Sequence, residues 1–378
     1  MSTSRIINQR ALIDAVYANN GISKAALATK LNLSKPAVSR NVADLISKGL
    51  VEERGKGEAS KSGGRKPTML YFNNSHRYIA TVVLSFDQPV CAIGDLSYNI
   101  LSLKKAEATR DSESEVKRES IAATINEMLK ELSIPKEKLA LIVISHPGII
   151  SWDNEASYSQ IVHFPWTGIG LRYYLVESFN TPVYLENDMR LAALGEKCMG
   201  FNNQYSDLIY VLCGIGFGAS VIHNGKPVLG CNRAAGEMGA FLTEDGKLLE
   251  DVVATSGLLS LVKELYTKHG LSTKDINFEK VVKLSLSNEP IVNHAVYETG
   301  RVLGKAIYNS CVMFDIPTVI LGGDYCKLGP ALFDGINEIV SKPSLLIRPN
   351  VIKSELREAA GMYGSFVIGT EEVLSRTL

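Results

Sequence analysis

The chain has 378 residues, of which 46% are hydrophobic and 21% are charged, and it holds 40 Lys and Arg against 40 Asp and Glu. This length predicts two or three domains with a substantial hydrophobic core. No run of about 18 apolar residues occurs, so we expect no membrane span. The N-terminal MSTSRIINQR lacks a signal peptide's apolar stretch, and the six cysteines form no CxxC pair. Both features favour a reduced, cytoplasmic setting.

The charge is unevenly distributed along the chain. Residues 1–70 hold 12 Lys and Arg against 5 Asp and Glu, whereas residues 71–378 hold 28 against 35. A basic N-terminal segment on an acidic body indicates a polyanionic partner for the first part alone.

Residues 1–74 are predicted to form a winged helix-turn-helix domain. Apolar residues at helical spacing predict a first helix over residues 6–18. Residues 22–50 then predict two short helices and a tight turn, with Ser23 and Ser34 as their N-caps. Gly49 is expected to end the second of these helices.

The second helix of this pair has two different faces. Val38, Val42 and Leu45 recur at the spacing of a buried apolar face. The opposite face offers short polar and cationic side chains, which suit base edges and phosphates in a major groove. The residues predicted to contact DNA are Ser34, Lys35, Ser39, Arg40 and Asn41. The alternative is an ordinary helical hairpin with a solvated face.

A wing is predicted to follow the helices. LVEER and TMLYF are expected to be strands, and the loop GKGEASKSGGRKP joins them. Its cationic residues Lys61, Arg65 and Lys66 could reach phosphates or the narrow minor groove. The Gly and Ser content would also suit a linker, but the flanking strands favour a wing. The predicted partner of this domain is a double-stranded DNA operator.

From residue 77 onward, predicted strands alternate with helices, which indicates a two-lobed α/β body. YIATVVLSF and VCAIGDL are expected to form a buried hairpin, and LALIVIS and PVYLEND are further strands. DLIYVLCGIGFGASVIHNG predicts two strands around a glycine loop. We expect a first lobe over 75–187 and a second over 188–359, with a C-terminal helix at about 360–378 packing back on the first.

Several short motifs occur in a characteristic order. They are SGGRKP, HPGII, LENDMRLAALGE, CGIGFGASVIHNGKPVLG, AAGEMGAF and VILGGDYCKLGP. In this order they resemble the ROK family (repressors, open reading frames, sugar kinases), in its DNA-binding branch. The resemblance covers nearly the whole chain. It implies an actin-like, ribonuclease-H-like body whose two lobes close over a sugar.

The motif LEND predicts the centre of a ligand site. A strand ends there as a helix begins, so Asn187 and Asp188 are expected at the cleft between the lobes. By resemblance, Asp188 matches the catalytic base of the family's kinases. A carboxylate there can accept hydroxyl hydrogen bonds, or deprotonate a hydroxyl if a phosphoryl donor is near. A helix N-cap is the alternative role for Asp188.

The resemblance implies further ligand residues. Glu237 matches the family's sugar-hydroxyl ligand, and Glu250 falls near a further sugar-binding Glu, although a solvated acidic loop is its alternative. His163 and Trp166 lie in the segment that shapes the sugar site, but either could be purely structural. Ala240 replaces the family's zinc-binding His, and TEDGKLLED contains no Cys or His. We therefore expect no zinc and no other cofactor.

Phosphoryl transfer is not expected. CGIGFG resembles the loop that cradles phosphate in the family's kinases. Those kinases open their body with Asp-x-Gly-Gly-Thr, whereas the corresponding VVLSFDQPV has no glycine pair, and Val83 or a neighbour replaces the acid. The chain therefore lacks half of a nucleotide site.

Together these features predict a transcriptional regulator. The first hypothesis is a repressor, a homodimer or homotetramer, controlled by a sugar or sugar phosphate in the interlobe cleft. One alternative is a sugar kinase with an attached DNA-binding domain. The other is a regulator whose body docks a protein partner instead of a sugar.

Overall fold

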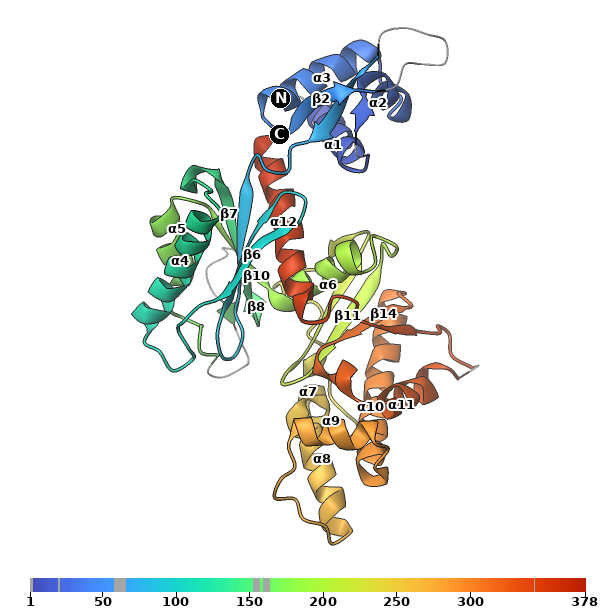
Figure 1. The fold of residues 1–378 in the computed structure, drawn as a ribbon. Coiled ribbons are helices and arrows are strands. Elements are labelled where there is room, and N and C mark those ends of the chain that lie inside the picture. Colours follow the sequence, from blue (N-terminus) through green and yellow to red (C-terminus); the bar gives the residue numbers. More distant parts are fainter. Residues whose placement is uncertain (1–2, 20, 58–65, 152–156, 159–163, 343) are drawn as a thin grey trace.

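A computed structural model describes residues 3–19, 21–57, 66–151, 157–158, 164–342 and 344–378. It has a small N-terminal module at one end and a larger body built on two five-stranded sheets (Figure 1). The chain ends beside the module in which it begins. Over the described ranges, every helix is too short or too polar to cross a bilayer.

The N-terminal module is a winged helix-turn-helix. Its elements are α1 (Thr3–Tyr17), β1 (Ile22–Ser23), α2 (Lys24–Lys30), α3 (Lys35–Ser47), β2 (Val51–Lys56) and β3 (Thr68–Phe72). The strands form an antiparallel sheet in the order β1-β3-β2. The predicted caps are confirmed, because the Ser23 and Ser34 hydroxyls accept hydrogen bonds from Ala26 N at 3.2 Å and Ala37 N at 3.3 Å.

The first lobe is the sheet of order β10-β7-β4-β5-β6 with the helices that cover it. Its strands are β4 (Tyr78–Val83), β5 (Val90–Asp95), β6 (Ile100–Lys105), β7 (Leu139–His146) and β10 (Val183–Asn187). Helices α4 (Ser114–Glu131) and α5 (Leu171–Phe179) cover one face, and α12 (Ala360–Thr377) covers the other. The smaller elements are a 3₁₀ turn (Lys136–Lys138) and the hairpin of β8 (Ile149–Ile150) and β9 (Ser157–Tyr158).

The second lobe is a sheet of order β13-β12-β11-β14-β15. Read from its other edge, this order is the same as that of the first lobe, with β11 in the place of β4. Its strands are β11 (Leu208–Cys213), β12 (Phe217–His223), β13 (Lys226–Pro227), β14 (Thr318–Gly322) and β15 (Asn350–Lys353). Its helices are α6 (Asp188–Gly195), α7 (Leu249–Val253), α8 (Thr255–Lys268), α9 (Phe278–Leu286), α10 (Pro290–Phe314) and α11 (Ala331–Val340). Short turns lie at Glu196–Gly200, Met238–Ala240, Asp324–Lys327 and Arg357–Ala359.

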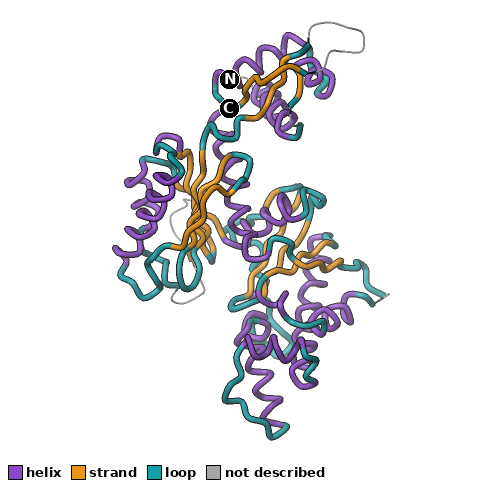
Figure 2. The backbone as a smooth tube through the Cα atoms, in the orientation of Figure 1, coloured by secondary structure: helices purple, strands orange, loops and turns teal. Residues whose placement is uncertain are grey.

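Both sheets therefore have three antiparallel strands followed by two parallel ones, which confirms the predicted actin-like, ribonuclease-H-like body. Strand β6 and helices α7–α9 were not predicted from the sequence. Strand β6 alternates between exposed and half-buried residues, so its hydrophobic pattern is weaker than that of β5, which is buried from Cys91 to Asp95. Figure 2 shows that most helices of the second lobe lie on the side of its sheet that is turned away from the first lobe.

Helices α6 and α12 cross where the two lobes meet (Figure 1). Their backbones approach so closely that only glycine fits. A Cβ atom on Gly364 would lie 1.7 Å from the Leu191 carbonyl oxygen, and one on Gly195 would lie 2.0 Å from the Ala360 oxygen. The start of α12 is thereby fixed to the helix that begins at Asp188.

The other end of α12 joins the N-terminal module. One hydrophobic cluster includes Leu12 and Leu70 of the module and Phe366 and Leu374 of α12. Arg10 of α1 forms an ion pair with Glu371, and Lys48 Nζ donates to the Leu378 carbonyl oxygen at 3.3 Å. Helix α12 thus spans from the contact between the lobes to the winged module.

Candidate functional site

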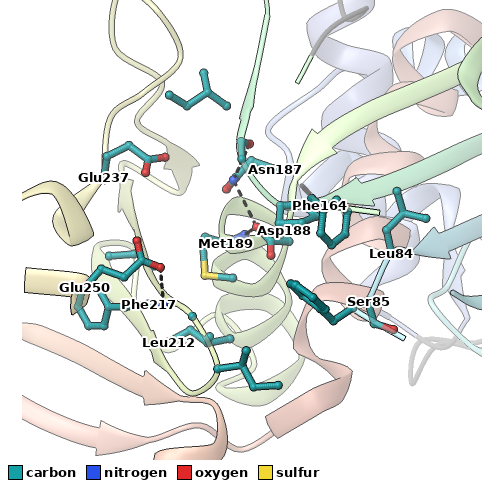
Figure 3. A pocket seen from close by; sticks show the side chains of 18 residues that line it. Leu84, Ser85, Phe164, Asn187, Asp188, Met189, Leu212, Phe217, Glu237 and Glu250 are labelled. Atoms are coloured by element: carbon teal, nitrogen blue, oxygen red, sulfur yellow. Dashed lines mark hydrogen bonds between the residues drawn. The ribbon is translucent and has the colours of Figure 1, made fainter. Parts of the chain in front are cut away.

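A cavity of about 510 Å³ lies between the lobes. The first lobe contributes residues 84–86 after β4 and residues 147–149 after β7. The second lobe contributes residues 215–219 around the turn from β11 to β12, together with Glu237 and Glu250. Figure 3 shows Asp188 and Met189 between these two walls.

Asn187 and Asp188 divide two roles between them. The Asn187 Oδ1 atom accepts from Arg190 N at 3.0 Å, so Asn187, rather than Asp188, is the N-cap of α6. Its Nδ2 atom donates to the Gly148 oxygen at 3.0 Å. The Asp188 Oδ1 atom accepts from Met189 N at 2.9 Å. This arrangement holds the Asp188 carboxyl at the cavity.

The electrostatic environment of Asp188 disfavours its charge. Burial raises the pKa of Asp188 to about 6; the Met189 N–H opposes this shift and the nearby Glu237 carboxylate adds to it. Burial also raises the pKa of Glu237. The positive charge of Arg190 opposes this upward shift, and the negative charge of Glu250 adds to it. Glu237 is more exposed to solvent than Asp188. The charge of Asp188 is therefore the one that gains most from new hydrogen-bond donors.

Glu250 also faces the cavity and is bound to the glycine loop. Its Oε1 atom accepts from Phe217 N at 3.3 Å. Gly214 N donates to the Gly216 oxygen at 3.0 Å, which closes the turn on itself. A Cβ atom on Gly218 would lie 2.7 Å from Met189 Cγ. Packing and turn formation thus account for glycines that resemble a phosphate loop.

A buried ionic network lies beneath the carboxylates. Glu186 accepts from Arg190 Nε at 2.8 Å and from Arg233 Nη2 at 2.7 Å. Arg190 Nη1 donates to the Arg233 carbonyl oxygen at 2.9 Å. These three residues are 2–8% exposed. The network anchors the loop that carries Glu237 to the start of α6.

This network was not predicted from the sequence. Glu186 and Arg190 have opposite charges and lie close in sequence on either side of the strand end, which could have suggested that pair. Arg233 lies 43 residues beyond Arg190, and no local pattern links the two. The loop from β13 to Glu237 brings them together.

The turn from β4 to β5 presents side chains to the cavity, among them Leu84 and Phe86. Trp166 is 2% exposed, and its Nε1 atom donates to the Ser85 oxygen at 2.8 Å. The structural role that the sequence left open for Trp166 is the one observed, because its ring is buried and supports this turn. His163 lies outside the described residues.

The region where the resemblance implies zinc has a different construction. Leu242 and Leu248 form a β-bridge, and Thr243 N donates to the Lys247 oxygen at 2.9 Å, so the shortened loop closes as a small hairpin. Among the residues that the structure describes, no group of three His, Cys, Asp or Glu is arranged to hold a metal. The residues of this loop do not fit a zinc ion.

The winged module places most of the described DNA-contact candidates on its surface. Ser34, Lys35, Ser39 and Arg40 are exposed, as is Lys66 at the base of the wing. The expected exposure of Asn41 is wrong. Asn41 is 8% exposed and its Nδ2 atom donates to the Ala37 oxygen at 2.9 Å, because its position turns toward the module's core. Lys61 and Arg65 lie outside the described residues.

The fold and the site define a class of protein with a winged DNA-binding module on an actin-like body. Residues 86–372 match the ROK family, and residues 5–65 match the MarR family. The chain belongs to the ROK family, and its N-terminal module is of the MarR type.

Individual proteins resemble all or most of the chain. The xylose repressor of Caldicellulosiruptor bescii is 25% identical over 389 residues, covering 98% of this chain and 96% of that protein. A solved ROK family transcriptional regulator, a homolog of the E. coli MLC protein, superposes with a TM-score of 0.81 at 19% identity, over 100% and 98% of the two chains. A ROK family glucokinase from Streptomyces griseus, in complex with glucose and AMPPNP, superposes with a TM-score of 0.64 at 18% identity, over 77% and 98%. At 19% and 18% identity, these two superpositions show that the fold is shared and nothing further.

Proposed function

We propose that this ROK family protein is a transcriptional repressor whose affinity for an operator falls when a sugar binds between its lobes. The observation that carries the proposal is the position of α12. This helix starts at the crossing with α6, beside the carboxylate-lined cavity, and ends against the winged module.

The DNA-binding half of the proposal rests on α3 and on charge. The exposed side chains of Lys35, Ser39 and Arg40 lie on the helix that follows the helix-turn-helix turn. Such residues hydrogen-bond to phosphates and base edges when a recognition helix enters the major groove. A homodimer or homotetramer would place two such modules on a symmetric operator.

The ligand-binding half rests on three carboxylates around one cavity. Asp188, Glu237 and Glu250 line it, and none of them has an ion-pair partner among the described residues. Sugar hydroxyls can donate to carboxylates and offset the cost of their burial. The name of the xylose repressor from C. bescii makes D-xylose a first sugar to test.

Helix α12 is the proposed mechanical link between the two halves. If ligand binding closes the lobes, the α6–α12 crossing moves, and the other end of α12 displaces the winged module. Two contacts would transmit this movement, namely Glu371 with Arg10 and the Leu378 carbonyl with Lys48. Lys48 in turn pairs with Asp44 of α3 at 3.4 Å.

A charge reversal tests the link. Glu371→Lys places like charges at the contact with Arg10, and we expect it to reduce the sugar's effect on operator affinity by about threefold, the scale of a surface ion pair. Glu372→Lys is the matched control, because Glu372 pairs with Arg376 of the same helix. Equal sugar responses in the two variants would exclude the Arg10 contact from the mechanism.

We also propose that the protein is not a kinase. Solved ROK structures include sugar kinases, so this is a separate claim. The turn at residues 84–89 has no glycine to admit a phosphate, and the Phe217 N–H of the other turn is already bound to Glu250. Incubation with ATP, magnesium and a panel of sugars should release no sugar-dependent ADP.

The experiment for the whole proposal has two steps. An operator is first selected from random duplexes by the purified protein, and Lys35→Ala and Arg40→Ala are expected to weaken its binding by about 1–3 kcal/mol each. A thermal-shift screen of sugars then identifies a ligand, whose effect on operator binding is measured. If no sugar binds, the proposal fails and a protein partner becomes the better explanation.

A further inference from the structure

The cavity wall combines acidic and apolar side chains, and this combination restricts the kind of ligand that it can bind. We propose that the ligand is an uncharged glycoside, with its ring hydroxyls on the three carboxylates and an apolar substituent between the two facing turns, and that sugar phosphates are excluded. This inference rests on the proposed function, because it concerns the same cavity.

Charge argues against a phosphate. Asp188, Glu237 and Glu250 are the charged residues that line the cavity in the described chain, and all three are acidic. The nearby Arg190 and Arg233 are bound to Glu186 and are 2% and 8% exposed. Residues 152–156 and 159–163, which lie outside the described residues, contain no Lys or Arg. A dianion would therefore meet repulsion without a compensating cation.

The backbone N–H groups of the turn from β11 to β12 also disfavour a phosphate. Anion sites in glycine loops depend on N–H groups that point at the ligand. Here Phe217 N donates to Glu250 and Gly214 N donates to Gly216 within the turn. A phosphate would have to displace a carboxylate of the protein to reach the first of these groups.

Apolar side chains form most of the rest of the wall, to which Ser85 and Asn187 also contribute. The first lobe supplies Leu84, Phe86 and Phe164, and the second supplies Leu212, Ile215 and Phe217. Two of them are exposed although they face the cavity, since Ile215 is 72% exposed and Phe86 is 39% exposed. Figure 3 shows Leu84 and Phe164 across the cavity from Glu237 and Glu250, with Asp188 between them. A sugar held by the carboxylates would thus bring its substituent against apolar surface.

The test is calorimetry on the full chain with matched ligands. These are D-xylose and D-glucose, their methyl and phenyl β-glycosides, and D-glucose 6-phosphate. For the sugar that binds, we expect the phenyl glycoside to bind at least about tenfold more tightly than the methyl glycoside, because its ring buries apolar area. D-Glucose 6-phosphate is expected to bind at least about tenfold more weakly than D-glucose.

Two variants assign the effect to the facing turns. Ile215→Asn should reduce the phenyl-to-methyl ratio to less than about threefold, so it should weaken binding of the phenyl glycoside more than binding of the free sugar. Met313→Asn is the matched control, because Met313 is 75% exposed on α10, outside the cavity, and it should keep the wild-type ratio.

The outcomes separate this inference from the proposed function. If neither the free sugars nor the glycosides bind, both fail. If a free sugar binds and changes operator affinity but the phenyl group adds nothing, or the phosphate binds more tightly, only this inference is overturned. It is also overturned if Ile215→Asn weakens all ligands equally, because Ile215 would then serve closure of the lobes.

Discussion

The first two strands of each lobe are joined by turns that occupy equivalent places in the two sheets but differ in chemistry. Residues 84–89 of the first lobe read LSFDQP, and residues 214–216 of the second read GIG. Both turns line the same cavity. The first lines it with the side chains of Leu84, Ser85 and Phe86. The second combines the Ile215 side chain with glycine backbone, and Glu250 accepts from the Phe217 N–H that follows it.

The difference between the two turns suits the body to ligand binding and not to phosphoryl transfer. Transfer of a phosphoryl group requires donors and charge on both sides of the phosphates. Here the first turn has no glycine that would let its backbone approach a phosphate, and Glu250 already binds an N–H group at the second. The carboxylates between them can still bind hydroxyl groups. The same repeated sheet thus supports binding without the groups that phosphoryl transfer needs.

The largest expected effect tests the carboxylate at the centre of the comparison. Asp188→Asn keeps the side chain's shape but removes a charged acceptor, so affinity for the sugar should fall by roughly one to two orders of magnitude. Calorimetry measures the loss, and Glu237→Gln should also weaken binding. Unchanged affinity in both variants would move the ligand site away from this cavity.

A smaller effect should follow from pH. Because the pKa of Asp188 is about 6, the group is ionised at pH 7 and largely protonated at pH 5. If the ionised form accepts the sugar hydroxyls, affinity falls by about tenfold as the pH decreases from 7 to 5. The sign follows because a pKa raised from 3.8 places the loss of charge within this window.

Calorimetry at both pH values checks the effect, with Asp188→Asn as the control. The variant should show a much flatter dependence. An affinity that increases toward pH 5 in the wild-type protein would mean that the protonated carboxyl binds the ligand.

The smallest effects distinguish packing from phosphate binding in the second turn. In Gly216→Ala the new Cβ atom meets nothing closer than Glu250 Oε1 at 3.6 Å, so stability and sugar affinity should stay near those of the wild-type protein. In Gly218→Ala it meets Met189 Cγ at 2.7 Å and Sδ at 2.8 Å, and we expect a loss of about 1–3 kcal/mol. Thermal unfolding measures both, and equal losses would contradict the packing explanation for Gly218.

Much of the architecture could be predicted from local patterns. Ser23 and Ser34 cap helices as their positions indicated, and the glycine loop joins two strands as expected. The resemblance predicted Asp188, Glu237 and Glu250 as ligand residues, and the structure brings all three to one cavity. Their proposed role in binding a ligand is still a prediction.

Other features depend on contacts that no local pattern encodes. Asn41 is a different case, because it lies three residues after Val38 and four before Leu45, which is the spacing of the buried face, so its burial could have been predicted. Arg233 meets Glu186 through a long loop, and Trp166 is fixed by the carbonyl of Ser85 in a distant turn. The glycines of the α6–α12 crossing follow from the approach of helices that lie far apart in the sequence.

The most direct test of the central claim is the operator affinity measured with and without a saturating sugar, in the wild-type protein and in Asp188→Asn. We predict that the sugar weakens wild-type operator binding by at least about tenfold, a typical allosteric coupling. Asp188→Asn should bind the operator normally without sugar and require roughly one to two orders of magnitude more sugar for the same effect. If calorimetry shows the cavity saturated while the wild-type operator affinity is unchanged, the account is contradicted.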